Sequence, residues 1–152
     1  MPIQLNLHPG YVEAVKAGRQ SASIYFDRFV YPRHILLGLI ETTNIVSHLI
    51  KKLLQENGAT LADLKEEIED SLSELKKANQ QRDPNFMKYH ENTQKVFEFA
   101  DVFAASEGYT LVCCHHLLLG IYEQKGKAAE ILKNMYVDRR CIERWLTSTL
   151  SF

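Results

Sequence analysis

The sequence predicts an all-α protein in which two pseudo-symmetric four-helix repeats pack into one compact domain. The first observation is an internal repeat. Residues 33–40 (RHILLGLI) recur as residues 115–122 (HHLLLGIY), which places His34 on His116 at an offset of 82 positions. A repeat of this length decides the architecture of a chain. The second observation is that apolar residues recur at helical spacing. The third is that no segment has the pattern of a strand, and the very short stretch 110–112 is the nearest candidate.

The first helix of repeat one has a clear start. Pro9 suits the first helical position, because its missing N–H and its fixed φ cost nothing there, and His8 precedes it as the capping residue. We expect this helix to run to about Ser23. A connector over residues 27–32 follows, and its last residue, Pro32, begins the next helix.

The repeated stretch predicts a helix that is buried on most sides, because each copy is apolar nearly all round for two turns. A glycine inside such a helix costs about 1 kcal/mol relative to alanine. Gly38 and Gly120 occupy equivalent positions in the two copies. We therefore expect a neighbouring helix to approach closely at each glycine.

Two more helices complete repeat one. Residues 42–44 break the buried helix, and a third helix runs from residue 45 to the stop signal at Asn57 and Gly58. Thr60 caps a fourth helix, with Asp63 three residues on. The acidic run at 66–70 is interpreted as its solvated face. The apolar face of this helix comprises Leu61, Leu64, Ile68, Leu72 and Leu75.

The second repeat follows a polar, aperiodic linker. We predict a single domain over residues 1–152, with repeat one at 7–79, the linker at 80–88 and repeat two at 89–151. Repeat two opens at Tyr89 and His90, and His90 aligns with His8. Its expected elements are a helix ending near 108, a connector at 109–114, the second buried helix, and helices over about 127–135 and from 138 towards 150.

Composition excludes several classes of function. The 152 residues are 45% hydrophobic and 24% charged with a net charge of −1, and no basic cluster exceeds two residues. A general nucleic-acid or anionic-membrane surface needs several cations on one face, so neither partner is expected. Neither a signal peptide nor a membrane-spanning apolar run is visible. The three cysteines, Cys113, Cys114 and Cys141, do not form a disulfide framework, and we expect reduced thiols and a cytoplasmic location.

Motifs of catalysis are missing from the sequence. There is no phosphate-binding loop of the G-x-x-x-x-G-K-[ST] type, no H-E-x-x-H metalloprotease motif, and no Glu-x-x-His pair of the kind that builds di-iron sites in helical bundles. A Cys114–His115 nucleophile pair lacks a recognisable orienting residue. We therefore expect no enzymatic activity, no catalytic residues and no cofactor.

The run Cys113-Cys114-His115-His116 is the one cluster that looks like metal ligands. Four consecutive residues cannot all reach one tetrahedral centre, and no C-x-x-C pair supplies the usual zinc geometry. Two of the four could ligate with help from elsewhere. We interpret one of the two cysteines as a small apolar residue at a helix start, and His34 and His116 as hydrogen-bonded core histidines. No metal site is predicted.

The doubled pattern resembles the N-terminal domain of the Clp family of AAA+ unfoldases. The residues that carry the resemblance are 34–39 (HILLGL), 116–121 (HLLLGI) and 126–132 (GKAAEIL), and it extends from about Leu7 to Leu150. It implies two pseudo-symmetric four-helix repeats. It also implies a non-catalytic role, in which the domain recruits substrates and adaptor proteins to a hexameric unfoldase that can feed a protease.

The resemblance also indicates where ligands bind, at the helix starts that flank the seam between the repeats. The predicted peptide- or adaptor-binding residues are Leu7, His8, Arg33, Tyr89, His90 and His115. In one branch of the family, a glutamate just before each motif histidine takes part in reading phosphoarginine. Arg33 and His115 stand at those positions, and neither favours a guanidinium as a carboxylate does. We expect a retained scaffold with an altered ligand preference.

Three alternatives remain beside recruitment by a Clp-type ATP-dependent unfoldase. That unfoldase could belong to the same longer chain or act in trans, and the chain could instead be a free-standing adaptor or decoy. It could be a metal-dependent protein that uses residues 113–116. It could also be a helical assembly protein that self-associates through exposed aromatic side chains, namely Tyr25, Phe26, Phe86 and Tyr89.

Overall fold

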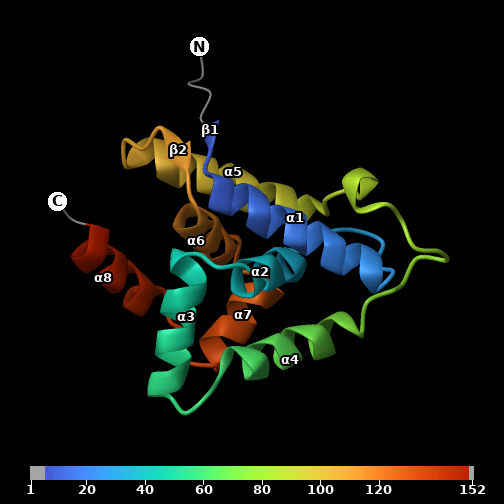
Figure 1. Ribbon diagram of the computed structural model, residues 1–152, viewed down its shortest axis with the longest axis horizontal. Coiled ribbons are helices and arrows are strands. Elements are labelled where there is room, and N and C mark those ends of the chain that lie inside the picture. Colours follow the sequence, from blue (N-terminus) through green and yellow to red (C-terminus); the bar gives the residue numbers. More distant parts are fainter. Residues whose placement is uncertain (1–5, 151–152) are drawn as a thin grey trace.

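The computed structural model describes residues 6–150 of the chain (Figure 1). In this range it has eight α-helices, one 3₁₀ turn (η1, Pro84–Phe86) and two strands of two residues each. The helices of repeat one are α1 (Pro9–Ile24), α2 (Pro32–Glu41), α3 (Ile45–Glu56) and α4 (Leu61–Leu72). Those of repeat two are α5 (Glu91–Ser106), α6 (Cys114–Gln124), α7 (Lys127–Asn134) and α8 (Arg139–Leu150). The predicted all-α fold of two four-helix repeats is confirmed.

The two repeats keep the sequence offset in three dimensions. Helices α5, α6 and α7 each begin 82 residues after α1, α2 and α3, respectively. Helix α8 begins only 78 residues after α4, because α7 has eight residues where α3 has twelve. Four residues are about one helical turn, so the second repeat lacks one turn of its third helix.

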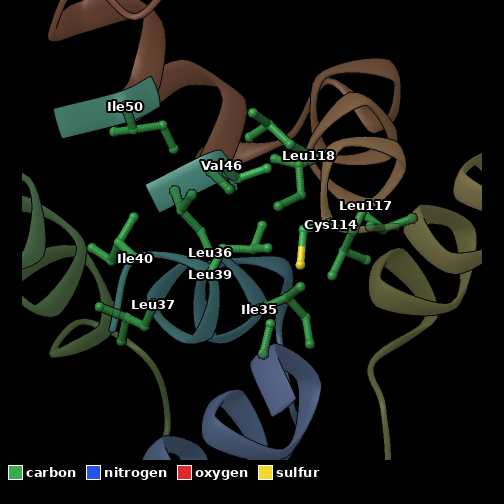
Figure 2. Close-up of a cluster of buried hydrophobic side chains, with 14 of the residues drawn as sticks. Ile35, Leu36, Leu37, Leu39, Ile40, Val46, Ile50, Cys114, Leu117 and Leu118 are labelled. Carbon is green, nitrogen blue, oxygen red and sulfur yellow. The ribbon is translucent and has the colours of Figure 1, made fainter. Parts of the chain in front are cut away.

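Helices α2 and α6 lie in the middle of the molecule and form its core (Figure 1). Every residue of α2 from His34 to Ile40 is buried, and so is every residue of α6 from Cys114 to Tyr122. Figure 2 shows side chains of α2 and α6 gathered with Val46 and Ile50 of α3. Burial of both apolar helices is the main source of stability that this fold has.

The two equivalent glycines allow close helix packing, as predicted. A Cβ atom on Gly38 would collide with the carbonyl oxygen of Ala14 on α1. A Cβ atom on Gly120 would lie 2.5 Å from the carbonyl oxygen of Val96 on α5. Since Ala14 and Val96 are themselves 82 residues apart, each repeat packs its first helix on its second helix in the same way.

The expectation that no segment forms a strand is wrong for two short stretches. Strand β1 (Asn6–Leu7) pairs in parallel with β2 (Leu111–Val112), and an isolated parallel bridge joins Val30 to Tyr89. Two-residue strands carry no alternating pattern that a sequence could reveal. Each pairing joins the segment before the first helix of one repeat to the connector of the other repeat. The repeats are therefore cross-linked twice through backbone hydrogen bonds.

The segment between α4 and α5 is held against repeat one. Helix α4 ends at Leu72, so Leu75, predicted on its apolar face, lies beyond the helix and packs on the core from the following segment. The Ala78 N–H donates to the Phe26 carbonyl at 2.6 Å. Lys77 donates to Asp27 in the same place. Within residues 6–150, no helix combines the length and the apolar character that crossing a membrane requires.

Candidate functional site

His34 fixes the start of α2 from inside the core. Its Nδ1 accepts the N–H of Tyr31 at 2.9 Å, and its Nε2 lies 2.6 Å from a carboxylate oxygen of Asp27. Because Nδ1 accepts a hydrogen bond, the neutral ring carries its proton on Nε2 and donates it to Asp27. Burial lowers the pKa of His34, although Asp27 opposes the shift. Burial also opposes ionisation of Asp27, but hydrogen bonds from His34 and Lys77 hold the pKa of its carboxyl below the ordinary value.

His116 has the same role at the start of α6. Its Nδ1 accepts the N–H of Cys113 at 2.9 Å, and its Nε2 lies 3.1 Å from a carboxylate oxygen of Glu107. The interpretation of His34 and His116 as hydrogen-bonded core histidines is confirmed. The offset does not identify the acidic partners, because the position equivalent to Asp27 in repeat two is Tyr109.

A group of half-buried aromatic side chains lies at the start of α2, where the connector of repeat one pairs with the first residues of repeat two. The His90 ring stacks on the Tyr31 ring with centroids 4.8 Å apart, and Phe29 meets both rings edge-on. The guanidinium of Arg33 lies over the Tyr31 ring, 5.7 Å from its centroid. We call Phe29, Tyr31, Arg33 and His90 the junction cluster, since it combines three residues of repeat one with one of repeat two.

Arg33 is also tied to the end of α4. Its guanidinium donates to the Ser71 carbonyl at 3.0 Å and to the Ser71 hydroxyl at 3.3 Å. The side chain is half-buried, and this desolvation lowers the pKa of Arg33. A fixed, partly desolvated guanidinium presents a positive surface in a defined orientation.

The facing sides of α1 and α5 form a seam beside the junction cluster. Tyr11 of α1 meets Phe97 of α5 at 6.3 Å between ring centroids, and Phe97 meets Tyr89 edge-on at 4.9 Å. Burial raises the pKa of Tyr89, while Arg19 acts in the opposite direction. Burial together with Asp101 raises the pKa of Tyr11. The seam therefore has an aromatic centre with a cation near one tyrosine and an anion near the other.

Leu7 and His8 lie at the other strand pairing between the repeats. Leu7 pairs with Val112, and the His8 N–H donates to the Val112 carbonyl at 3.0 Å. His8 caps α1 as predicted, because its Nδ1 accepts the N–H of Gly10. The Leu7 side chain is 46% exposed. It is an apolar side chain available at the edge of the interface.

His115 is buried in a pocket of repeat two. A pocket of about 510 Å³ between α5, α6 and α8 is lined by His115, Glu107 and Tyr109, with Phe103 and Leu119 among its apolar walls. The Nε2 of His115 is buried and has no hydrogen-bond partner among the described residues. Burial, with a contribution from neighbouring His116, lowers the pKa of His115 to about 4. His115 is therefore neutral near pH 7.

The cysteines of the cluster are not activated nucleophiles. Cys114 packs in the core beside α2, which confirms the interpretation of a cysteine as a small apolar residue at the helix start (Figure 2). Burial raises the pKa of Cys114 to about 11. Burial and Glu107 raise the pKa of Cys113. A thiol that is protonated at neutral pH is a poor nucleophile.

The structure divides the six predicted binding residues into three places. Arg33 and His90 belong to the junction cluster, and Tyr89 lies beside it. Leu7 and His8 lie at the pairing of β1 with β2, and His115 lies in the pocket of repeat two. Sequence reasoning did not single out Phe29 and Tyr31 of the junction cluster, Glu107 or Phe97. Phe29 and Tyr31 had a signal in the sequence, as aromatic residues just before the first buried helix, whereas Glu107 and Phe97 had none. Of the four aromatic side chains expected to be exposed, Tyr25, Phe26 and Phe86 are exposed, whereas Tyr89 is half-buried in the seam.

Similarity to known proteins agrees with this architecture. The family described as the Clp repeat (R) N-terminal domain matches residues 6–135. The Hsp104 N-terminal domain from Candida albicans has a similar structure, with a TM-score of 0.78 and 14% sequence identity over 96% of this chain and 92% of that one. The N-terminal domain of the chaperone ClpD from Arabidopsis thaliana has a TM-score of 0.71 and 20% identity over 93% of this chain and 95% of that one. No curated protein matches the chain in sequence at a significant level.

Proposed function

The chain belongs to the Clp repeat N-terminal domain family, and we propose that it is a protein-binding module that recruits substrates or adaptors to a Clp-type ATP-dependent unfoldase. N-terminal domains of this family are generally non-catalytic modules. The unfoldase belongs either to the same longer chain or to a partner in trans. Acting as a free-standing adaptor or decoy is the second form of the same proposal.

The observation that supports this proposal is the junction cluster. Aromatic and arginine side chains are the residues that contribute most to protein–protein binding, because they offer a large apolar surface with a polar end. Tyr31 and His90 are half-buried and held in place by stacking, so they lose little side-chain entropy when a partner covers them. The neighbouring seam extends this surface through Tyr89.

The charge around the junction cluster indicates its preference. Arg33 adds a positive group over Tyr31, so we expect an extended segment with apolar and acidic residues to bind better than a basic one. The exposed apolar side chain of Leu7 provides a further contact at the opposite strand pairing. The six residues predicted from the sequence remain our proposed binding residues, with Phe29 and Tyr31 added.

Binding to a permanently unfolded protein tests this proposal. The probe is reduced, carboxymethylated α-lactalbumin carrying a fluorescent label, and anisotropy reports its affinity. We expect Tyr31→Ala and His90→Ala each to weaken binding at least about five-fold, because an interface anchor is worth about 1 kcal/mol or more. Phe86→Ala is the matched control, since Phe86 is an aromatic side chain that is 80% exposed on η1. Equal losses in all three variants would contradict the assignment.

The proposed ligand preference has its own test. A glutamate at these two positions would pair with a guanidinium group. Arg33 instead repels a guanidinium group, and His115 is neutral. We expect the doubly exchanged variant, Arg33→Glu with His115→Glu, to gain affinity for a phosphoarginine peptide relative to the unmodified chain. An affinity that does not rise in calorimetry would contradict the view that these two positions set the preference.

A further inference from the structure

We propose that repeat two holds a divalent metal site of the zinc class, with Cys113 Sγ, His115 Nε2 and the carboxylate of Glu107 as its protein ligands. The geometry points to it directly. The ligand atoms of Cys113, His115 and His116 all lie within 4.8 Å of one another. The His115 Nε2 lies 4.0 Å from a carboxylate oxygen of Glu107. Thiolate, imidazole and carboxylate are the three side-chain ligands that zinc uses.

The buried, unpartnered nitrogen of His115 is the strongest support. A buried polar atom without a hydrogen bond is energetically unfavourable. The His115 side chain is only 6% exposed, and yet its Nε2 has no hydrogen-bond partner among the described residues. Nothing in its hydrogen bonding fixes the tautomer, so Nδ1 can carry the proton and leave a lone pair on Nε2 for a metal.

Hydrogen bonding excludes His116 as a ligand, although it belongs to the same cluster. Its Nδ1 accepts the Cys113 N–H, so the neutral ring carries its proton on Nε2. That proton is donated to Glu107. Binding a metal through Nε2 would require an imidazolate. His116 instead orients the carboxylate, in the way that hydrogen-bonding partners orient ligating carboxylates in known sites.

Binding a tetrahedral ion requires the ligand atoms to move closer together. Zinc bonds of 2.0–2.3 Å place neighbouring ligand atoms about 3.6 Å apart. Glu107 is 42% exposed and lies at the end of α5, so its side chain can close the remaining gap by rotation. Binding displaces the thiol proton of Cys113 to solvent, and the thiolate then bonds the metal. Two of the three ligands, His115 and Glu107, line the pocket of about 510 Å³, from which water can supply the fourth ligand.

Repeat one provides an internal contrast. The positions equivalent to Cys113, His115 and Glu107 are occupied by Tyr31, Arg33 and Tyr25. None of these three is an ordinary zinc ligand. The histidine that fixes the helix start, by contrast, is present in both repeats as His34 and His116. The three proposed ligands are therefore a feature of the second repeat alone. This inference does not depend on peptide binding at the junction cluster.

Titration with Zn²⁺ and Co²⁺ tests the site on the purified, reduced chain. We expect one ion per chain and, with Co²⁺, the near-ultraviolet charge-transfer absorption of a cobalt–thiolate bond. Cys113→Ser should abolish that absorption, and His115→Ala should weaken Zn²⁺ binding at least about ten-fold. Cys141→Ser, which removes a half-buried cysteine on α8, is the matched control and should leave both unchanged.

Glu107→Gln tests the site in a variant that should remain folded. Glu107 is substantially exposed, and glutamine still accepts the hydrogen bond from His116. We expect it to keep the circular-dichroism spectrum and melting temperature of the original chain while weakening Zn²⁺ binding at least about ten-fold. Three results would overturn the proposal: no saturable binding below about millimolar Zn²⁺, cobalt–thiolate absorption that persists in Cys113→Ser, or unchanged affinity in Glu107→Gln.

Discussion

The glycines of the buried helices give the sharpest test of how the repeats pack. Two effects of Gly→Ala substitution oppose each other at Gly38 and Gly120. Helix propensity alone favours alanine by about 1 kcal/mol. The added Cβ, however, meets a backbone carbonyl oxygen of α1 or α5, which cannot move aside as a side chain can. Overpacking a core of this kind costs about 1–3 kcal/mol, and sometimes more.

The worked expectation is net destabilisation at both sites. At Gly120 the 2.5 Å approach to Val96 predicts a loss of about 1 kcal/mol after the propensity gain. At Gly38 the overlap with Ala14 is deeper, so we expect a loss of about 2 kcal/mol or more. For a chain of this length, 1 kcal/mol corresponds to about 2–4 °C in melting temperature.

Urea unfolding followed by far-ultraviolet circular dichroism measures both variants. Gly38→Ala should lower the free energy of unfolding more than Gly120→Ala does, and each should unfold at lower urea concentration than the original chain. If either alanine variant proved more stable, propensity would outweigh packing, and the close approach of the first two helices in each repeat would be refuted.

Three further predictions concern the hydrogen bonds of repeat one and the junction. Because the pKa of His34 is lowered on folding, the unfolded chain takes up that proton first as pH falls below about 6.5, so stability is lost on acidification. The groups facing it are Asp27, Arg33 and Lys77. His34→Gln should therefore show a smaller fall in melting temperature between about pH 7.5 and 5.5, and an equal fall would contradict the assignment. Lys77→Met should lower the free energy of unfolding in urea by about 1–2 kcal/mol. The loss is smaller than for a fully buried ion pair because Lys77 is partly exposed, and an unchanged free energy would show that Asp27 does not need the lysine. Thr93→Val removes one hydrogen bond to a connector carbonyl and should cost about 1 kcal/mol in the same assay, whereas a gain in stability would rule out that bond.

Much of the fold could be predicted because the apolar, glycine and histidine positions of the buried helix occur in both repeats. The alignment of Gly38 with Gly120 and of His34 with His116 identifies the same packing and the same cap in both halves. The short α7 was predicted by the expected range 127–135, whereas the two-residue strand pairings could not be predicted. A two-residue ladder leaves no periodic signal, and the pairing of β1 with β2 depends on contacts between residues about 105 positions apart.

The proposed binding residues could be chosen from the sequence, but their contacts could not. The resemblance predicted a binding region at the helix starts beside the seam, and the structure brings Arg33 and His90 together at Tyr31. The contacts that give each residue its role come from other parts of the chain. Ser71 of α4 accepts a hydrogen bond from Arg33, and Glu107, the residue after α5, pairs with His116. Partners of this kind depend on how the helices cross, and sequence spacing does not encode that.

Amide chemical-shift mapping is the most direct test of whether an unfolded protein binds at the junction of the two repeats. The isotope-labelled chain is titrated with unlabelled reduced, carboxymethylated α-lactalbumin. We predict shifts concentrated at Phe29, Tyr31, Arg33, Tyr89 and His90, with Leu7 and His8 affected next. Shifts concentrated instead on the far helices α3, α7 and α8, with the junction cluster unchanged, would contradict the account.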